Sequence, residues 1–333
     1  MEPSLRPKPP RFVDAELLHT ALPLEGAVAA LDQGIRARDE AQLQGSLRTS
    51  LGVSGREPGD AAEILLMPAS GREGSGVKLV SICQRNESLG LPIIQGVYVL
   101  LNQKTLTPEL VIDGAALTEL RTAALSALAT RYLARPQSRR LVVFGAGVQA
   151  RGHVRAMRTV LPIDHVSIIP SSPTSLRARA LLAELEVDGV EAVIDGLGAL
   201  SRADVVCCCT TSKTPLFHDG LLRPGTHINA VGAYRLDMAE LPVQTLRRAL
   251  LVVETLEAAR SEAGDVVAAL EAGLLSEPRF AVTLSELLNG LSGRKSPDQI
   301  TTFKSVGLAS EDLIVARAVA NALVDRQITE ALD

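Results

Sequence analysis

Aromatic residues are the scarcest class in this chain: its 333 residues include three Tyr, five Phe and no Trp. So few rings leave no obvious platform for stacking nucleic-acid bases. A net charge of −4 and a pI near 5.8 also lack the basic excess of nucleic-acid-binding proteins. We therefore expect no nucleic-acid partner.

Long apolar runs are also missing. Hydrophobic residues make up 46% of the chain, but they never form the uninterrupted run of about 18 residues that a membrane-spanning helix requires. Residues 1–11 are polar and rich in proline, so we expect a loose arm there and no signal peptide. These absences predict no membrane partner.

Cysteines are few and unsuitably spaced for two common roles. The four are Cys83 and the consecutive Cys207, Cys208 and Cys209, which match neither a disulfide framework nor a metal-ligand pattern. The run continues an apolar stretch from Val206, so we interpret it as an interior strand. We expect buried, reduced thiols, no metal site and a cytoplasmic location.

The most informative stretch that is present spans residues 139–156, RRLVVFGAGVQARGHVRA. An apolar run at 141–144 predicts a buried strand, and a segment of helical periodicity follows the glycines. Gly145 permits a tight turn, Gly147 allows close approach of a pyrophosphate, and Ala150 lets the helix pack near the strand. An ordinary Gly-rich turn is the alternative, but the flanking strand and helix favour a dinucleotide site.

The region around this motif alternates short apolar runs with helical segments from residue 139 to residue 254. Such alternation predicts a parallel sheet with helices on both faces. Ligands of these sheets bind beyond the carboxyl ends of the strands. The loops at 210–212 and 232–234 therefore fall on the cofactor side.

The end of the second strand of this region bears on which nicotinamide cofactor binds. NAD-dependent proteins often place an acid there, about 20 residues beyond the glycines. This chain has IIPSSP at 168–173, and Asp164 lies at the wrong end of the strand. Ser171, Ser172 and Thr174 can donate to a phosphate, and Arg177 or Arg179 can supply charge. We expect NADPH, with NADH possible.

The N-terminal region has a different texture. Helical spacing at 13–38, with Asp14 as N-cap, precedes four runs rich in Val, Ile and Leu at 63–69, 76–84, 92–102 and 108–113. They predict an antiparallel sheet or an open barrel. Lys78 lies within the second run, where it either reaches an edge or points into a site.

Two helices complete this prediction. One covers 117–133, capped by Thr118 or Asp113, with Arg121 in its first turns. The other covers 313–323, with Ser310 as N-cap and two acids in its first turn.

Seven segments in order resemble the ornithine cyclodeaminase/μ-crystallin family over nearly the whole chain. They begin at residues 76, 90, 113, 144, 210, 225 and 303, reading GVK, GLPIIQG, DGAALTELRTAALSALA, FGAGVQARGH, TTSKTPLF, GTHINAVGA and FKSVGLASEDL. The resemblance implies a homodimer of α/β class. A Rossmann-type doubly wound parallel sheet (121–304) would be inserted in a second α+β substrate-binding and dimerisation domain (1–120 plus 305–333).

The resemblance also implies roles for particular residues. Lys78 is similar to the family's active-site lysine, and Arg48 and Arg121 to the arginines that hold a substrate carboxylate, with Met67 lining the pocket. A guanidinium binds a carboxylate bidentately, which suits this role. The expected cofactor-binding residues are Thr122, Gly145, Ala146, Gly147, Val148, Gln149, Ser171, Ser172, Thr210, Thr211, Ser212, Val231, Gly232, Ser305, Val306 and Gly307.

One departure from the family pattern bears on the reaction. Ornithine cyclodeaminases carry an Asp where this chain has Tyr234, and the nearest acid is Asp237. Ketimine reductases of the family also lack that Asp. We therefore expect reduction of a cyclic ketimine by NAD(P)H, with Lys78 as proton donor and Tyr234 as a weaker catalytic candidate.

Three alternatives stay open at this point. The chain could be a cyclodeaminase that holds NAD+ tightly, or an alanine- or opine-type dehydrogenase. It could also be a binding protein without turnover, which the retained Lys78, Arg48 and Arg121 argue against.

Overall fold

The computed structural model describes residues 9–37, 44–45, 48–53, 62–290 and 293–330. The chain forms two compact units, Met1–Arg121 with Leu308–Asp333, and Thr122–Gly307. We call them unit 1 and unit 2 and describe each by itself. Residues 1–8 of the expected N-terminal arm, and Arg38, lie outside the described residues.

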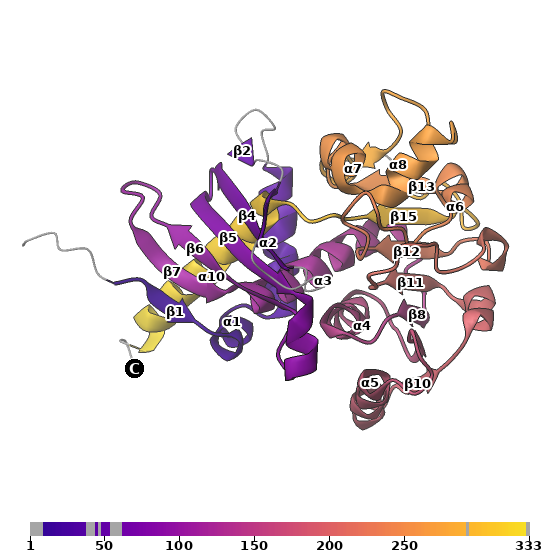
Figure 1. Cartoon of the computed structure of the whole chain (residues 1–333), viewed down its shortest axis with the longest axis horizontal. Coiled ribbons are helices and arrows are strands. Elements are labelled where there is room, and N and C mark those ends of the chain that lie inside the picture. The colour runs from indigo at the N-terminus through magenta and orange to yellow at the C-terminus, as the bar shows by residue number, and fades with distance from the viewer. Residues whose placement is uncertain (1–8, 38–43, 46–47, 54–61, 291–292, 331–333) are drawn as a thin grey trace, which may run out of the picture. The chain divides into compact units, whose positions relative to one another are not determined.

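Unit 1 is built on an open mixed sheet (Figure 1). Its strands are β1 (Arg11–Val13), β2 (Gln44–Gly45), β3 (Thr49–Gly52), β4 (Ala62–Gly71), β5 (Gly74–Cys83), β6 (Ile94–Leu101) and β7 (Pro108–Asp113). The order is β1-β7-β6-β5-β4-β2, with β3 also paired to β4. The four predicted runs pair antiparallel as expected, whereas β1, which the sequence did not reveal, adds a parallel edge.

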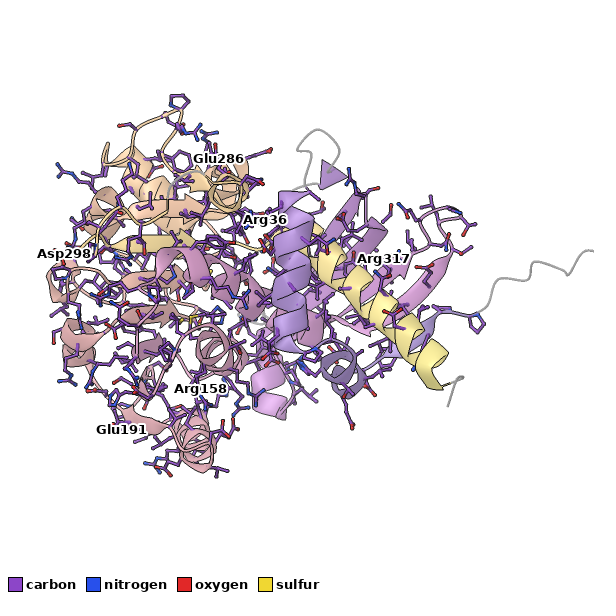
Figure 2. All side chains as sticks on the ribbon, turned by 180° about the vertical axis from the view of Figure 1, so that it is seen from behind. Arg36, Arg158, Glu191, Glu286, Asp298 and Arg317 are labelled. Atoms are coloured by element: carbon purple, nitrogen blue, oxygen red, sulfur yellow. The ribbon has the colours of Figure 1, made fainter. Side chains whose placement is uncertain are left out.

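Helices cover one face of this sheet. They are α10 (Ala309–Glu330), which contacts β4, β5 and β6, and α1 (Ala15–Ala21) and α2 (Leu24–Arg36), which contact α10. The 3-10 turn η1 (Gln84–Leu89) connects β5 and β6. Figure 1 shows α10 lying across the strands. Arg317 of α10, labelled in Figure 2, anchors it by pairing with Glu109 at 2.9 Å and donating to the Glu73 carbonyl at 2.8 Å.

The N-caps of two helices, α1 and α3 (Gly114–Leu133), can be compared with the residues predicted to form them. Asp14 caps α1, because its side chain accepts the Leu17 N–H at 2.8 Å, as expected. Asp113, not Thr118, caps α3 by accepting from the N–H groups of Ala115 and Ala116.

The predicted cap of the last helix was wrong. The helix starts at Ala309, so Ser310 lies inside its first turn. The Glu311 carboxylate accepts the Leu308 N–H at 3.0 Å instead, as a side chain near a helix start often does.

Unit 2 holds an eight-stranded parallel sheet flanked by helices, as the alternation predicted. The strands are β8 (Arg140–Phe144), β9 (His165–Ile169), β10 (Glu191–Ile194), β11 (Val205–Cys208), β12 (His227–Ala230), β13 (Leu250–Val253), β14 (Val282–Thr283) and β15 (Thr301–Lys304). Their order is β10-β9-β8-β11-β12-β15-β13-β14. Cys207 and Cys208 are fully buried in β11, while Cys209 follows the strand and is half-buried.

The helices of unit 2 connect these strands. They are α4 (Val148–Val160), α5 (Leu176–Val187), α6 (Val243–Arg248), α7 (Leu256–Glu262), α8 (Gly264–Glu271), α9 (Leu284–Leu288) and the 3-10 turns η2 (Leu197–Arg202) and η3 (Asp219–Leu221). The C-terminal part of α3 also belongs to this unit. Across the described parts of the chain, none of the helices has the length and hydropathy to cross a membrane.

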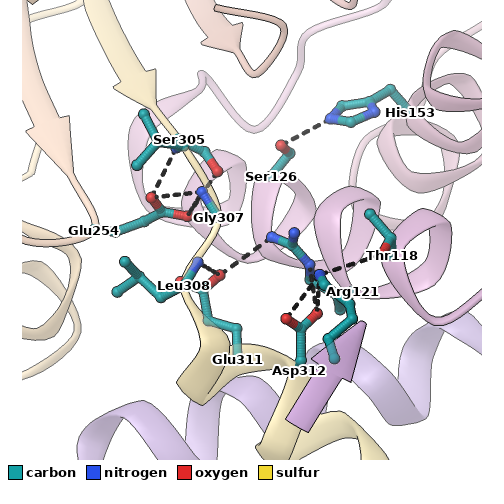
Figure 3. Close-up of polar contacts among 12 residues, drawn as sticks. Thr118, Arg121, Ser126, His153, Glu254, Ser305, Gly307, Leu308, Glu311 and Asp312 are labelled. Atoms are coloured by element: carbon teal, nitrogen blue, oxygen red, sulfur yellow. Dashed lines mark hydrogen bonds and ion pairs between the residues drawn. The ribbon is translucent and has the colours of Figure 1, made fainter. Parts of the chain in front are cut away.

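Two histidines are buried in the core of unit 2. His153 contacts the Ser126 hydroxyl at 2.9 Å (Figure 3), and His227 contacts Thr130 at 3.1 Å and Thr301 at 3.0 Å. Burial lowers the pKa of His153 to about 4 and the pKa of His227 to about 3, because desolvation disfavours the imidazolium. Both rings are neutral at physiological pH.

Candidate active site

A row of three side chains on the inner face of the unit 1 sheet forms the floor of the candidate site. Lys78 of β5 lies opposite Met67 of β4 and Tyr98 of β6 in the strand register. Cross-strand partners share a face, and all three are buried, Lys78 with 2% of its surface exposed. Lys78 therefore points inward, into the packed face, and does not reach an edge.

Lys78 is held by a buried aspartate. Its Nζ donates to Oδ1 of Asp312 at 2.9 Å and lies 2.8 Å from Oδ2. It also donates to the Thr118 hydroxyl at 3.3 Å. Asp312 has no exposed surface, so this pair is a desolvated ion pair of the kind that requires close geometry to be stable.

Arg121 shares the same aspartate. Its Nε lies 3.0 Å from Oδ1 of Asp312, and its Nη1 lies 3.4 Å from Oε2 of Glu311. Figure 3 shows Arg121 facing both acids across the start of α10. The guanidinium thus pairs with two carboxylates, which favour one orientation before any ligand arrives.

The electrostatics of this cluster act mainly on Lys78. Burial lowers its pKa to about 8; the Asp312 carboxylate opposes that shift, while the charges of Arg121 and Arg48 add to it. Arg48, half-buried just before β3, is therefore close enough to influence the lysine. The structure thus gathers the four predicted unit 1 residues, Arg48, Met67, Lys78 and Arg121.

Tyr98 is a buried phenol that sequence reasoning missed. A Cβ at Gly76 would lie 2.3 Å from its hydroxyl oxygen, so the ring needs glycine at that position. Burial raises the pKa of Tyr98 well above its usual value, so its hydroxyl stays protonated.

Asp312 and Glu311 were predicted only as charges that favour a helix start. Two acids opening an otherwise apolar, Ala-rich helix were the available signal. The sequence did not say which cations they would face.

The Gly-rich turn of unit 2 has the features that a bound pyrophosphate requires. Gly145 has φ 95°, and a Cβ there would lie 2.6 Å from the Cys209 carbonyl oxygen. Gly147 caps α4 without a side-chain hydrogen bond, and a Cβ there would meet nothing within 4 Å. The start of the 13-residue helix is therefore open to an anion, with Ala146, Val148 and Gln149 beside it.

Glu240 organises the next two loops along this edge. Its buried carboxylate accepts from the Thr210 N–H at 2.7 Å, the Thr210 hydroxyl at 2.8 Å and the Gly232 N–H at 2.7 Å. Thr210 and Gly232 are both predicted cofactor residues, and these donor groups bind Glu240 in this structure. A Cβ at Gly232 would lie 1.9 Å from the Thr210 carbonyl, so only glycine fits there.

Glu254 does the same for the loop after β15. It accepts from the Ser305 hydroxyl at 2.7 Å, the Val306 N–H at 2.8 Å and the Gly307 N–H at 3.0 Å (Figure 3). Neither Glu240 nor Glu254 stood out in the sequence, because a lone Glu after an apolar run is ordinary.

The remaining predicted cofactor residues of unit 2 differ in how far they are buried. Thr122 is buried in α3, Val231 is half-buried and Thr211 is exposed. The Ser212 hydroxyl donates to the Thr214 carbonyl. Tyr234, the catalytic candidate of unit 2, is half-buried directly after Ala233.

The second strand of unit 2 ends near polar side chains. Ser171 is exposed, and the Ser172 hydroxyl lies 2.9 Å from that of Thr174. The structure also brings Asp195, just past β10, beside β9: its N–H donates to the Ile168 carbonyl and its carboxylate accepts from Ser167 at 3.2 Å. The sequence pattern of the β9 strand alone could not reveal this acid. No cluster of three metal-ligating side chains occurs among the residues the structure describes.

A doubly wound sheet with an open glycine turn defines a dinucleotide-binding class of α/β protein. Residues 23–327 match the sequence model of the Ornithine cyclodeaminase/mu-crystallin family. A Delta(1)-pyrroline-2-carboxylate reductase of Bacillus cereus is 35% identical over 86% of this chain and 88% of that protein. The chain belongs to the ornithine cyclodeaminase/mu-crystallin family, as its sequence segments predicted.

Solved structures agree with this assignment. Thermococcus litoralis Delta(1)-pyrroline-2-carboxylate reductase, in complex with NADH and L-proline, is similar with a TM-score of 0.87 and 30% identity over 95% of this chain and 98% of that one. An archaeal alanine dehydrogenase dimer with bound NAD has a TM-score of 0.86 and 28% identity, with coverages of 96% and 97%. The predicted fold class is confirmed, and these solved relatives carry NADH or NAD.

Proposed function

We propose that this protein reduces a cyclic ketimine carboxylate with a reduced nicotinamide cofactor. The substrate is Δ1-pyrroline-2-carboxylate or Δ1-piperideine-2-carboxylate, and the product is L-proline or L-pipecolate. The observation that carries the proposal is the buried cluster in which Lys78 and Arg121 share Asp312, with Arg48 acting on Lys78. The similarity of the chain to Delta(1)-pyrroline-2-carboxylate reductases of Bacillus and Thermococcus supports this class of reaction.

Each residue of the cluster has a part in this chemistry. Arg121 and Arg48 bind the carboxylate of the substrate, and Met67 lines the pocket beside Lys78. Lys78 donates a proton to the ring nitrogen, since a pKa of about 8 suits an acid working near neutral pH. A bound reduced nicotinamide would supply a hydride to the imine carbon, so that the C=N bond would become a C–N single bond and the nitrogen would keep the proton from Lys78.

The two segments divide the work in this proposal. Unit 1, which includes Arg121, binds substrate and forms the dimer contact, and unit 2, which includes the 305–307 loop, holds the dinucleotide. The open start of α4 beyond Gly145 and Gly147 supports the second assignment. Gly232 and the 305–307 loop lie at the carboxyl ends of neighbouring strands, where such sheets bind ligands.

The proposed cofactor is NADPH, in preference to NADH. Ser171, Ser172 and Arg177 offer donors and charge beyond β9, and the carboxylate of Asp195 is already engaged with Ser167. Steady-state kinetics with both cofactors tests this preference. A higher kcat/KM with NADH than with NADPH would reject the NADPH preference. In that case, a loss of NADH-dependent activity in Asp195→Asn would assign the contact with the ribose hydroxyl to Asp195.

We propose a homodimer formed through the outer face of the unit 1 sheet. Leu66, Leu79 and Val97 form one row on that face, and Leu66 and Leu79 are 37% and 40% exposed. Phe12 of β1, at 58%, extends the apolar surface. Leu79→Asp places a charge on the proposed dimer face, so sedimentation should show a monomer. Val187 is an exposed apolar residue of unit 2, and Val187→Asp should leave the dimer intact.

The experiment that tests the reaction follows cofactor oxidation with a panel of substrates. Cyclic ketimine carboxylates should be reduced, and ornithine should release no ammonia, because Tyr234 replaces the aspartate of the cyclodeaminases. Ammonia release without net cofactor consumption would identify a cyclodeaminase instead. Binding of the ketimine with no turnover would identify a binding protein.

A further inference from the structure

We propose that Asp312 is a positioning residue that keeps Lys78 charged for proton transfer and holds Arg121 ready for the substrate carboxylate. This inference rests on the proposed ketimine reduction and deepens it. Asp312 reaches both cations from the first turn of α10, whereas Lys78 comes from β5 and Arg121 from α3. One carboxylate thus links three elements of unit 1.

The geometry distinguishes Asp312 from its neighbour Glu311. Both oxygens of Asp312 lie within 2.9 Å of the Lys78 Nζ, and Oδ1 also lies 3.0 Å from the Arg121 Nε. Glu311 pairs with Arg121 at the longer distance of 3.4 Å and accepts the Leu308 N–H. Asp312 is therefore the acid through which the proton donor and the carboxylate-binding arginine are coupled.

The groups that face Lys78 explain why the lysine needs this acid. Thr118 and Arg121 face it from α3, Tyr98 from β6, and Arg48 acts from the segment before β3. Burial and two arginine charges favour the neutral amine, while Thr118 and Tyr98 bring no charge. Asp312 supplies the opposing negative charge, and an opposite charge at this distance typically moves a pKa by about 1–3 units.

The same charge has a predictable cost for substrate binding. In Asp312→Asn, Glu311 still pairs with Arg121 and keeps it in place, while the negative charge that repels the substrate carboxylate is gone. KM should therefore not rise even as kcat falls. A purely structural residue would not produce this split, because its loss would weaken binding and turnover together. The split therefore separates a positioning role from a folding role.

The test compares Asp312→Asn, Asp312→Glu and the wild type over about pH 6 to pH 10. Loss of Lys78 protonation defines the alkaline limb of kcat in the wild type, near pH 8. In Asp312→Asn that limb should move at least about one unit lower, with KM unchanged or lower. Asp312→Glu should recover part of the shift. Glu109→Gln removes a different ion pair of α10, that with Arg317, and should leave the limb in place.

A second measurement does not depend on catalysis. NMR titration of protein with isotope-labelled lysine gives the pKa of Lys78 in each folded variant, and Lys78→Arg assigns its signal. A lower value in Asp312→Asn supports the inference, and an unchanged value overturns it, whether or not turnover is seen. If the value falls but no ketimine is reduced by any variant or the wild type, the proposed function fails while the coupling of Asp312 to Lys78 stands.

Discussion

Four buried carboxylates, two in each unit, have different kinds of partner, and a fifth, Asp265 of unit 2, pairs with the buried Lys304 at 3.4 Å. In unit 1, Asp312 and Glu311 pair with the side-chain cations Lys78 and Arg121. In unit 2, Glu240 and Glu254 accept mainly from backbone N–H groups of the loops beyond β11, β12 and β15. Both arrangements satisfy a desolvated negative charge, but with different kinds of donor.

The kind of partner decides whether a buried carboxylate can influence a reaction or only hold a loop in place. A lysine can lose and regain its proton near neutral pH, and a guanidinium can bind a ligand carboxylate, so the partners in unit 1 can take part in a reaction. A backbone N–H can do neither at neutral pH. The glutamates of unit 2 therefore fix the path of the loops that the proposal assigns to the dinucleotide.

The largest effect is expected when the proposed proton donor of unit 1 is removed. Lys78→Ala should lower kcat by about 10²–10⁴-fold, the usual contribution of general acid catalysis. Dinucleotide affinity, followed by fluorescence quenching or titration calorimetry, should stay nearly unchanged. Tyr234→Phe removes only a hydroxyl and should cost little. The reverse pattern would give the proton to Tyr234.

The next effect concerns the arginine that shares Asp312. Arg121→Lys keeps the charge but loses the planar fork, so kcat/KM should fall by about 10- to 100-fold, equivalent to roughly 1.5–3 kcal/mol for a charge-assisted bond. Kinetics with a ketimine carboxylate measure this change. A near-wild-type value would remove Arg121 from the site.

A smaller effect is expected in unit 2. Glu254→Gln weakens the acceptor of the Val306 and Gly307 N–H groups, which should loosen the loop and raise the dissociation constant of the cofactor by about tenfold. The matched control is Glu277→Gln, which breaks an exposed ion pair with Arg260 in the same unit and should change little. Equal effects of the two variants would contradict the role given to Glu254.

The last prediction leaves turnover at neutral pH unchanged and concerns stability alone. His153 and His227 have pKa values lowered by burial to about 4 and about 3, so the unfolded chain binds more protons below its own histidine pKa of about 6.5. Stability is fully present above that pH and is lost as pH falls towards about 4. Each histidine should cost about 2 kcal/mol between pH 6.5 and pH 5.

Urea unfolding at these two pH values measures the loss. His153→Gln cannot charge, so it should unfold with a shallower pH dependence than the wild type. An equally steep dependence would mean that His153 is protonated in the folded protein.

Local patterns determined much of this protein. The GAGVQA turn needs Gly145 at φ 95° and an unobstructed Gly147, both of which are conditions on a few adjacent residues. Runs of apolar residues with periods of two or 3.6 identified most of the longer strands and helices, because burial of one face is written into adjacent positions. The strands β1, β2, β3, β14 and β15 were missed because their two to four residues form no continuous apolar run.

The family resemblance named Lys78 and Arg121, but only the tertiary structure decided which acid these two cations share. Lys78 and Asp312 are 234 residues apart, and no local pattern relates a lysine in a strand to an acid in the last helix. The sequence assigned Asp312 to a helix start, where a negative charge is favourable for a local reason. Packing α10 on the inner face of the sheet gave that charge its second partner, because a buried lysine is stable in its charged form only beside an opposite charge.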